Sequence, residues 1–433
     1  MSKNIDTEFI TDLTNIINSK EDYLDFNGVS MDYSTHKYHD YPATMIPKLP
    51  DLFLNTVTKY KKINTLYDPF MGSGTTLVEG LRHNIDSTGI DLNPLAVLMS
   101  RVKTRKLDDA KLTTLFKKIQ DGFIGQKTLL EAGKITVETP DFKNIDYWYK
   151  PYVITDLQLL RNQIMAIEDL EYREFFLVAF SGTVRYVSNT RNGEFKMYRM
   201  APKTLEKWHP DVLAKFIEIA SKNIEANSKL KGSSAKAHVI LGTSMKTDLP
   251  DNSFDMLITS PPYGDSKTTV AYGQFSRTSL QWLDLKEMPA NKVPKIDREL
   301  LGGTLKDKEI RKTASPTLNK YIDEINEIDN KRALEVIQFY DDLFVVLKEC
   351  YRVMKPDSYQ VWVTANRTVK GIQLPTDQII TELYESLGVK KLAHFTRNIP
   401  NKRMPSKNSP TNKKGKKLST MKQENIVVYK TIK

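Results

Sequence analysis

Four consecutive residues, Ser260, Pro261, Pro262 and Tyr263, have side chains and backbone groups that could do chemistry together. They follow Met256–Thr259, an apolar run that predicts a buried strand. Proline has no N–H donor and fixes φ, so carbonyl groups in this turn stay available to a ligand. Ligands of open α/β sheets bind beyond the carboxyl ends of the strands, where this turn should lie. A hydroxyl, exposed carbonyls and an aromatic ring suit a planar group with an exocyclic amine. A proline-stiffened loop without chemistry is the alternative.

A second stretch, residues 65–94, has the pattern strand, glycine turn, helix, strand. Asp68 ends the first strand, Gly72 and Gly74 form the turn, and Asp91 ends the second strand. Glycines let a backbone approach a ligand closely, and an acid at the end of the second strand can hold ribose hydroxyls. The ordered set therefore predicts a nucleoside site.

The ligand of this site is not expected to carry a pyrophosphate. Leu77 stands where the dinucleotide fingerprint has its third glycine, and no Gly-Lys-Ser/Thr sequence follows the turn. A nucleoside without a pyrophosphate fits better, and S-adenosylmethionine is such a ligand.

Together, the segments DPFMGSGTT (68–76) and SPPY (260–263) resemble the amino-methylating DNA methyltransferases. In that family a DPFxGSGT segment binds the cofactor, and an (S/D)PPY segment methylates an exocyclic nitrogen of cytosine or adenine. The resemblance spans about residues 33–104 and 237 to the end of the chain. It implies an α/β fold, the Rossmann-like seven-stranded sheet of the S-adenosylmethionine-dependent methyltransferases. It also implies a cofactor set, Asp68, Phe70, Gly72, Gly74, Thr75, Asp91 and Asn93, and a catalytic set, Ser260, Pro261, Pro262 and Tyr263.

The resemblance also implies roles for single residues. Ser260 and the Pro261 carbonyl would accept the hydrogens of the amine, and Tyr263 would stack on a base flipped out of the duplex. Serine at the first motif position is commoner among the cytosine-N4 enzymes, so N4 of cytosine is the expected target. The loop around Tyr41 would line the methionine end of the pocket. Relatives place an acid near residue 243; Ser244 and Asp248 are the residues here that could replace it.

Three other functions stay open. Adenine N6 methylation uses all the same parts. RNA guanine N2 methylation uses similar Asp-Pro-Pro-Tyr turns, but Ser260 and the lack of an N-terminal RNA-binding domain argue against it. A non-catalytic nucleic-acid-binding subunit would show a damaged motif, and both motifs are intact. Cytosine C5 methylation needs a thiolate nucleophile, and the single cysteine, Cys350, lies in a helical segment without a Pro-Cys turn.

Composition limits location and partners. Hydrophobic residues make up 40% of the 433 residues, no apolar run reaches the roughly 18 residues that span a bilayer, and the polar N-terminus lacks a signal-peptide pattern. We therefore expect a cytoplasmic protein with no membrane contact. His36 and His39 are expected to be a loop pair, and no metal is expected.

The net charge of +11 is concentrated at the end of the chain, since eleven lysines and arginines and one acid, Glu424, lie from Arg397 onward. A local basic patch is stronger evidence for a polyanionic partner than a uniformly basic surface would be. Double-stranded DNA is the expected partner, and a restriction endonuclease encoded nearby is the expected companion. A solubilising loop is the alternative interpretation of this patch.

The chain is expected to divide into three parts. Residues 1–104 form the N-terminal segment and the first part of the methyltransferase core, and 105–235 form a helical insertion that is the candidate DNA-recognition region. Residues 236–433 complete the core, with a long irregular loop at about 284–319 and a basic loop at 397–417. Within the insertion, 188–200 breaks the helical pattern and interleaves basic and aromatic residues, which suits phosphates and unstacked bases; a solvated loop is the alternative.

Overall fold

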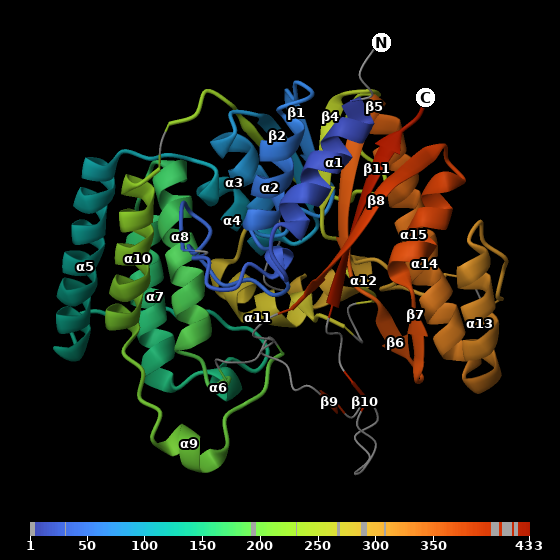
Figure 1. Cartoon of the computed structure of the whole chain (residues 1–433). Helices are drawn as coiled ribbons and strands as arrows, with labels where there is room; N and C mark the ends of the chain where they lie inside the picture. Colours follow the sequence, from blue (N-terminus) through green and yellow to red (C-terminus); the bar gives the residue numbers. More distant parts are fainter. Residues whose placement is uncertain are drawn as a thin grey trace.

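The computed structural model describes residues 5–30, 32–191, 196–230, 232–265, 269–286, 292–306, 309–399 and 423–433, together with short strands at 407–408 and 418–419. Its centre is a seven-stranded sheet in the order β3-β2-β1-β4-β5-β11-β8 (Figure 1). The neighbouring strands from β3 to β5 are parallel, whereas β11 is antiparallel to both β5 and β8. The strands are β1 (Thr65–Asp68), β2 (Asp86–Asp91), β3 (Ala237–Leu241), β4 (Phe254–Thr259), β5 (Met354–Thr364), β8 (Val389–Asn398) and β11 (Gln423–Thr431).

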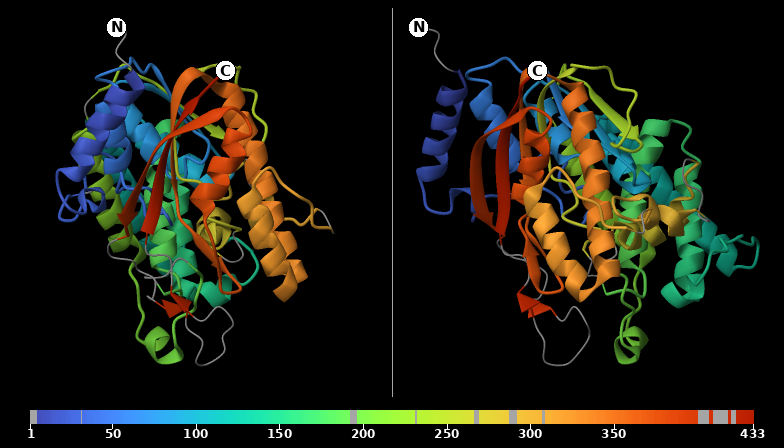
Figure 2. Two further views of the ribbon diagram at one scale, coloured as in Figure 1. Left: turned by 45° about the vertical axis from the view of Figure 1, so that its right-hand side comes forward. Right: turned by 90° about the vertical axis from the view of Figure 1, so that its right-hand side faces the viewer.

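Both faces of the sheet are covered, and alternating side chains supply the two cores. Leu66 of β1 points into one hydrophobic cluster with α1 (Ile5–Asn18) and α2 (Lys48–Val57). The next residue, Tyr67, points into the opposite cluster with α14 (Asn330–Val353) and α15 (Thr376–Glu385). The start of α1 and the end of β11 lie at the same end of the molecule (Figure 2), where Lys430 Nζ donates to Asp6 Oδ2 at 2.8 Å.

The order of the strands reverses between β1 and β4. From β1 the chain proceeds outward to β2 and β3, and then it returns to β4 on the other side of β1. Asp68 ends β1 and Thr259 ends β4, and the Thr259 hydroxyl donates to Asp68 Oδ1 at 2.6 Å. Such a reversal leaves a crevice at the carboxyl ends of the strands, which is where ligands of open α/β sheets bind.

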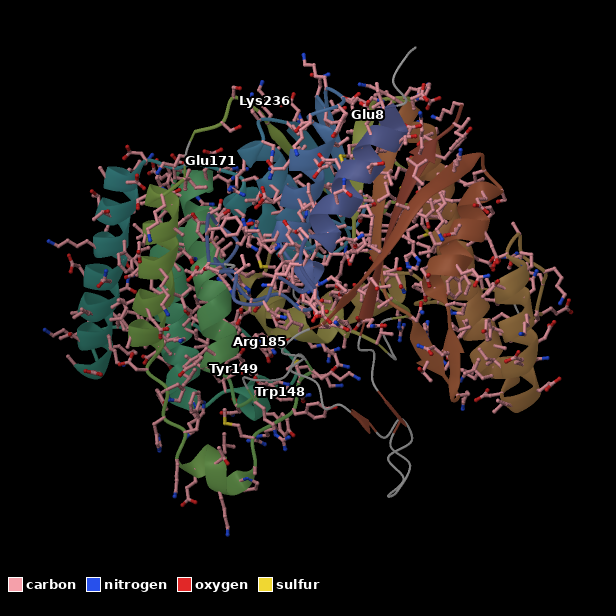
Figure 3. The ribbon with its side chains drawn as sticks, viewed as in Figure 1. Glu8, Trp148, Tyr149, Glu171, Arg185 and Lys236 are labelled. Carbon is pink, nitrogen blue, oxygen red and sulfur yellow. The ribbon has the colours of Figure 1, made fainter. Side chains whose placement is uncertain are left out.

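The helices of residues 105–235 follow β2 and precede β3 along the chain, and they pack against the core. Five of these helices bury a common cluster with α4 and α11, and Trp282 of α11 lies among the rings of Phe142, Tyr149 and Phe180. Figure 3 shows Tyr149 and Arg185 in this junction, where the Arg185 guanidinium lies 4.0 Å from the centre of the Phe275 ring. The helices of the insertion are α5 (Asp109–Glu131), α6 (Ile145–Trp148), α7 (Pro151–Met165), α8 (Leu170–Tyr186), α9 (Pro202–Glu206) and α10 (Val212–Ser228). The core helices next to them in the chain are α3 (Thr75–Arg82), α4 (Pro94–Lys103) and α11 (Tyr272–Leu283).

The segment 284–319, expected to be an irregular loop, contains short helical elements at 293–299 and the start of a longer helix at 316 among its described residues. A 3₁₀ turn, η2 (Val293–Lys295), leads into α12 (Ile296–Glu299), because Val293 and Ile296 bury their side chains in the cluster around α11. Ser315 then caps α13 (Pro316–Ile328) by accepting from the Leu318 N–H at 3.0 Å.

Several short elements complete the chain. A 3₁₀ turn, η1 (Tyr23–Asp25), follows α1, and β6 (Arg367–Val369) pairs with β7 (Ile372–Leu374) after β5. Between β8 and β11, β9 (Lys407–Asn408) pairs antiparallel with β10 (Leu418–Ser419). Most of the basic loop lies outside the described residues. Among the helices that are described, none has the length and apolar content to cross a membrane.

Candidate active site

A cavity opens at the carboxyl ends of β1 to β4, where the order of the strands reverses. Its walls come from the loops that follow these strands, from the loop before α2, and from α11 and the segment after α12. They include Tyr41, Pro42, Met45, Asp68, Phe70, Gly72, Thr75, Asp91, Asn93, Ser244, Met245, Ser260, Pro262, Tyr272, Leu300 and Leu301. The two sequence motifs therefore meet at one cavity.

Asp91 closes the glycine turn through its carboxylate. Oδ2 accepts from the Gly72 N–H at 3.0 Å and Oδ1 accepts from the Asn93 N–H at 2.8 Å. Burial raises the pKa of Asp91 to about 6, although these two backbone donors oppose the rise. Gly72 has φ +50°, a left-handed conformation that glycine adopts readily, and it lines the cavity.

Gly74 has a different position from its motif neighbours. It does not line the cavity, and it begins α3 with φ +83°. A Cβ added here would lie 2.8 Å from Ser100 Oγ and 3.1 Å from Ser100 Cα of α4. The missing side chain therefore admits α4, and the Ser100 hydroxyl donates to the Gly72 carbonyl at 3.0 Å.

Asp68 is buried at the end of β1. Its Oδ1 accepts from the Phe70 N–H at 3.0 Å as well as from Thr259. Burial raises the pKa of Asp68 to about 6 despite these donors. Phe70 turns its ring to Trp362, with centroids 6.5 Å apart, and so forms an apolar wall of the cavity.

Asn93 ties three segments together beside the cavity. Its Oδ1 accepts from the Leu95 N–H and caps α4, and its Nδ2 donates to the Tyr41 hydroxyl at 3.1 Å and to Ser276 Oγ at 2.7 Å. The loop around Tyr41 thus reaches the cavity. Of the two residues considered near position 243, Ser244 lines the cavity and bonds to the Pro69 carbonyl, whereas Asp248 does not line it.

The turn Ser260–Tyr263 presents only part of its motif to the cavity. Ser260 and Pro262 line it, while Pro261 and Tyr263 do not. The Tyr263 hydroxyl lies 3.2 Å from Ser260 Oγ and donates to Glu424 Oε1 at 2.9 Å. Burial and the neighbouring Glu424 raise the pKa of Tyr263 well above its ordinary value.

The sequence analysis gave Glu424 no role and counted Arg397 in the basic loop 397–417. The two residues are paired across β11 and β8, and Arg397 Nη1 lies 2.8 Å from Glu424 Oε2. The Arg397 side chain is only 3% exposed, so it is not part of a basic surface. Alternation along the two strands could have placed both residues on one face, but the register between the strands could not be read from the sequence.

Helices α6 and α9 of the insertion lie below the sheet in Figure 1, on the side of α11. The Arg199 guanidinium lies 4.1 Å from the centre of the Tyr147 ring, and the Arg191 N–H donates to the Tyr198 carbonyl at 2.8 Å. Tyr147 and Tyr198 are 46% and 47% exposed. Phe195, also expected here, lies outside the described residues.

The hydrogen-bond acceptors and walls of the cavity fit S-adenosylmethionine. The Asp91 and Asp68 carboxylates suit hydroxyl and ammonium groups, while Phe70 and Met245 offer apolar surfaces to a purine. Together with the order of the strands and the glycine turn, these acceptors and apolar walls define the class of S-adenosylmethionine-dependent methyltransferases.

Comparison with known proteins narrows the class. The chain is 46% identical to the type II methyltransferase M.MvaI of Kocuria varians over 442 aligned positions, which cover 98% of this chain and 97% of that protein. It is 22% identical to M.BsoBI of Geobacillus stearothermophilus over 80% of this chain and 77% of that protein. A segment of 77 residues is 42% identical to M.MjaII of Methanocaldococcus jannaschii and covers 18% of this chain and 14% of that protein. No protein-family model matches. The chain belongs to the type II DNA methyltransferase family.

Proposed function

We propose that this protein transfers the methyl group of S-adenosylmethionine to N4 of cytosine in double-stranded DNA, as the modification enzyme of a restriction–modification system. The observation that carries the proposal is the meeting of Ser260 and Pro262 with the glycine turn at one cavity. An acceptor for an amine therefore lies beside the site that suits the methyl donor.

The target amine is a poor nucleophile, because its lone pair is delocalised into the pyrimidine ring. Ser260 Oγ would accept one of its hydrogens at the cavity wall. The resemblance implies the Pro261 carbonyl as the acceptor of the other, although Pro261 does not line the cavity in this structure; the two acceptors would favour tetrahedral geometry at nitrogen. The bound cofactor supplies a methyl group activated by a sulfonium. The residues of the turn contribute positioning and preorganised hydrogen-bond acceptors, because no covalent intermediate with the protein is needed.

The cofactor would be held by the turn after β1 and the acid after β2. Asp91 would accept the ribose hydroxyls, and Phe70 and Thr75 would line its pocket with Gly72. Gly74 would act through the packing of α4 rather than by contact, since its missing side chain faces Ser100.

The target base would leave the duplex to reach the cavity, at a cost of a few kcal/mol. The resemblance implies that Tyr263 stacks on that base; in this structure Tyr263 does not line the cavity, and its hydroxyl is held by Ser260 and Glu424. Phosphates and flanking bases would meet the insertion around Arg199 and the loop between β8 and β11.

Cytosine is proposed over adenine because the first position of the motif is a serine, which the resemblance associates with the cytosine enzymes. A carboxylate accepts a hydrogen bond more strongly than a hydroxyl does, and Ser260 supplies only a hydroxyl. Transfer to carbon would need a thiolate nucleophile. The Cys350 thiol is buried inside α14 and burial raises its pKa, which supports transfer to nitrogen instead.

The proposal is tested by expressing the protein in a host that lacks DNA methylation and sequencing the host DNA with base-modification detection. We expect modified cytosines in one recurring sequence, and none in a host that expresses Ser260→Ala. Modified adenines would assign the enzyme to the adenine class, and unmodified DNA from the wild-type host would refute the proposal.

A further inference from the structure

Glu424 joins the catalytic turn to the last two strands of the sheet. Its Oε1 accepts from the Tyr263 hydroxyl at 2.9 Å, and the same hydroxyl oxygen lies 3.2 Å from Ser260 Oγ. Ser260 in turn lines the cavity. A continuous chain of hydrogen-bonding groups therefore runs from the cavity wall to a carboxylate.

The direction of the hydrogen bonds in this chain is fixed by counting protons. A phenol has one hydrogen, and Tyr263 gives it to Glu424, so Ser260 must donate to the Tyr263 oxygen. The lone pairs of Ser260 Oγ then remain available to an amine in the cavity. Each group is set to receive a proton from one neighbour and pass one to the next.

The carboxylate at the end of the chain is held by an ion pair. Arg397 Nη1 lies 2.8 Å from Glu424 Oε2, and the side chains of Arg397 and Glu424 are 3% and 16% exposed. The arginine therefore keeps Oε1 turned to Tyr263. The small exposure of Glu424 leaves a route by which a proton can return to water.

Methylation of an amine requires such a proton acceptor. The nitrogen forms a bond to the methyl carbon, the carbon–sulfur bond breaks with its electron pair going to sulfur, and the nitrogen becomes cationic. One N–H proton must then leave to give the neutral methylated amine. A serine hydroxyl is too weak a base to keep that proton.

We propose that Glu424 is the proton acceptor of the reaction, through Tyr263 and Ser260. The amine proton passes to Ser260 Oγ, the serine proton passes to the Tyr263 oxygen, and the tyrosine proton passes to Glu424 Oε1 as the methyl group arrives. Serine and tyrosine end neutral and unchanged, and Glu424 ends protonated. This inference rests on the proposed function, because it takes Ser260 as the group that contacts the amine.

The test compares single-turnover rates of methyl transfer to DNA. Glu424→Gln keeps an acceptor for the tyrosine hydroxyl but cannot take a proton, and Tyr263→Phe interrupts the chain while leaving the Glu424–Arg397 pair in place. Both should slow the transfer about 100-fold or more, and the double variant should be no slower than the worse of the two. Affinity for S-adenosylmethionine should stay near the wild-type value. Gln423→Ala is the matched control, since this neighbour bonds to Asn398 instead and should leave the rate unchanged.

A solvent isotope effect distinguishes the relay from a role in positioning alone. If the relay carries the proton, the wild-type transfer should slow in deuterated water, and this solvent isotope effect should vanish in both variants. Transfer by Glu424→Gln at the wild-type rate, or by Tyr263→Phe at the wild-type rate, would overturn the relay. Failure of the proposed function is seen separately, as the absence of methylcytosine from DNA treated with the wild-type enzyme.

Discussion

Gly74→Ala tests whether the second glycine of the turn serves packing or ligand binding. At φ +83° a residue with a Cβ is strained by about 1–2 kcal/mol, and this Cβ would lie 2.8 Å from Ser100 Oγ and 3.1 Å from Ser100 Cα. Overpacking of this kind costs about 1–3 kcal/mol more. We therefore expect the free energy of unfolding to fall by about 2–5 kcal/mol.

Gly133→Ala is the matched control, because Gly133 has φ +67° and no atom within 4 Å of an added Cβ. Its free energy of unfolding should fall only by the cost of the strained backbone conformation, about 1–2 kcal/mol. Urea unfolding of the two variants and the wild type, measured in parallel, separates the contributions.

Calorimetry with S-adenosylmethionine completes the comparison. Displacing α4 moves Ser100, which donates to the Gly72 carbonyl, and Gly72 in turn donates to Asp91. Binding should therefore weaken together with stability in Gly74→Ala and stay unchanged in Gly133→Ala. Equal stability of the two variants would refute the packing account. Weaker binding at unchanged stability would show that Gly74 touches the ligand directly.

Three further predictions concern the site and the DNA surface. Ser260→Ala should lose most turnover and keep the calorimetric affinity for S-adenosylmethionine, because the serine hydroxyl serves the amine and not the sulfonium; a large drop in affinity would contradict its role. Because burial raises the pKa of Asp68 to about 6 from 3.8, the folded form binds a proton that the unfolded chain releases. Stability should thus fall by about 3 kcal/mol as pH rises from about 4 to about 7, and Asp68→Asn should remove this part of the pH dependence in urea titrations, while an unchanged profile would refute the assignment. Replacing Lys413, Lys414, Lys416 and Lys417 by alanine should weaken binding to all DNA sequences and lower the salt dependence by about 0.9 in log–log slope for each phosphate that is no longer neutralised; weaker binding to one sequence alone would make the loop a base reader.

Local patterns were enough to predict the strand, turn and helix that carry one half of the candidate site, within residues 65–94. Strand, turn and helix follow one another there within 30 residues, and the acid after β2 bonds back to Gly72 of the same segment. The helices of the insertion were likewise predicted from their apolar spacing, which is a property of neighbouring residues.

Interactions between distant residues could not be predicted in this way. Tyr263 and Glu424 are 161 positions apart and meet only because β11 pairs with β5 in one register. Charge counting placed Arg397 on a basic surface, since it takes no account of the strand pairing that buries this side chain against Glu424. The start of α13 could have been predicted, because a serine cap followed by proline at 315–316 is a helix-start signal.

Analysis of the methylated nucleoside tests the central claim most directly. DNA methylated by the purified wild-type protein is digested to nucleosides and examined by mass spectrometry, with Ser260→Ala as the control. The proposed mechanism predicts N4-methylcytosine from the wild type and no methylated nucleoside from the variant. N6-methyladenine would contradict the assignment of the target base, and 5-methylcytosine would contradict the mechanism itself, because the single cysteine, Cys350, is buried within α14.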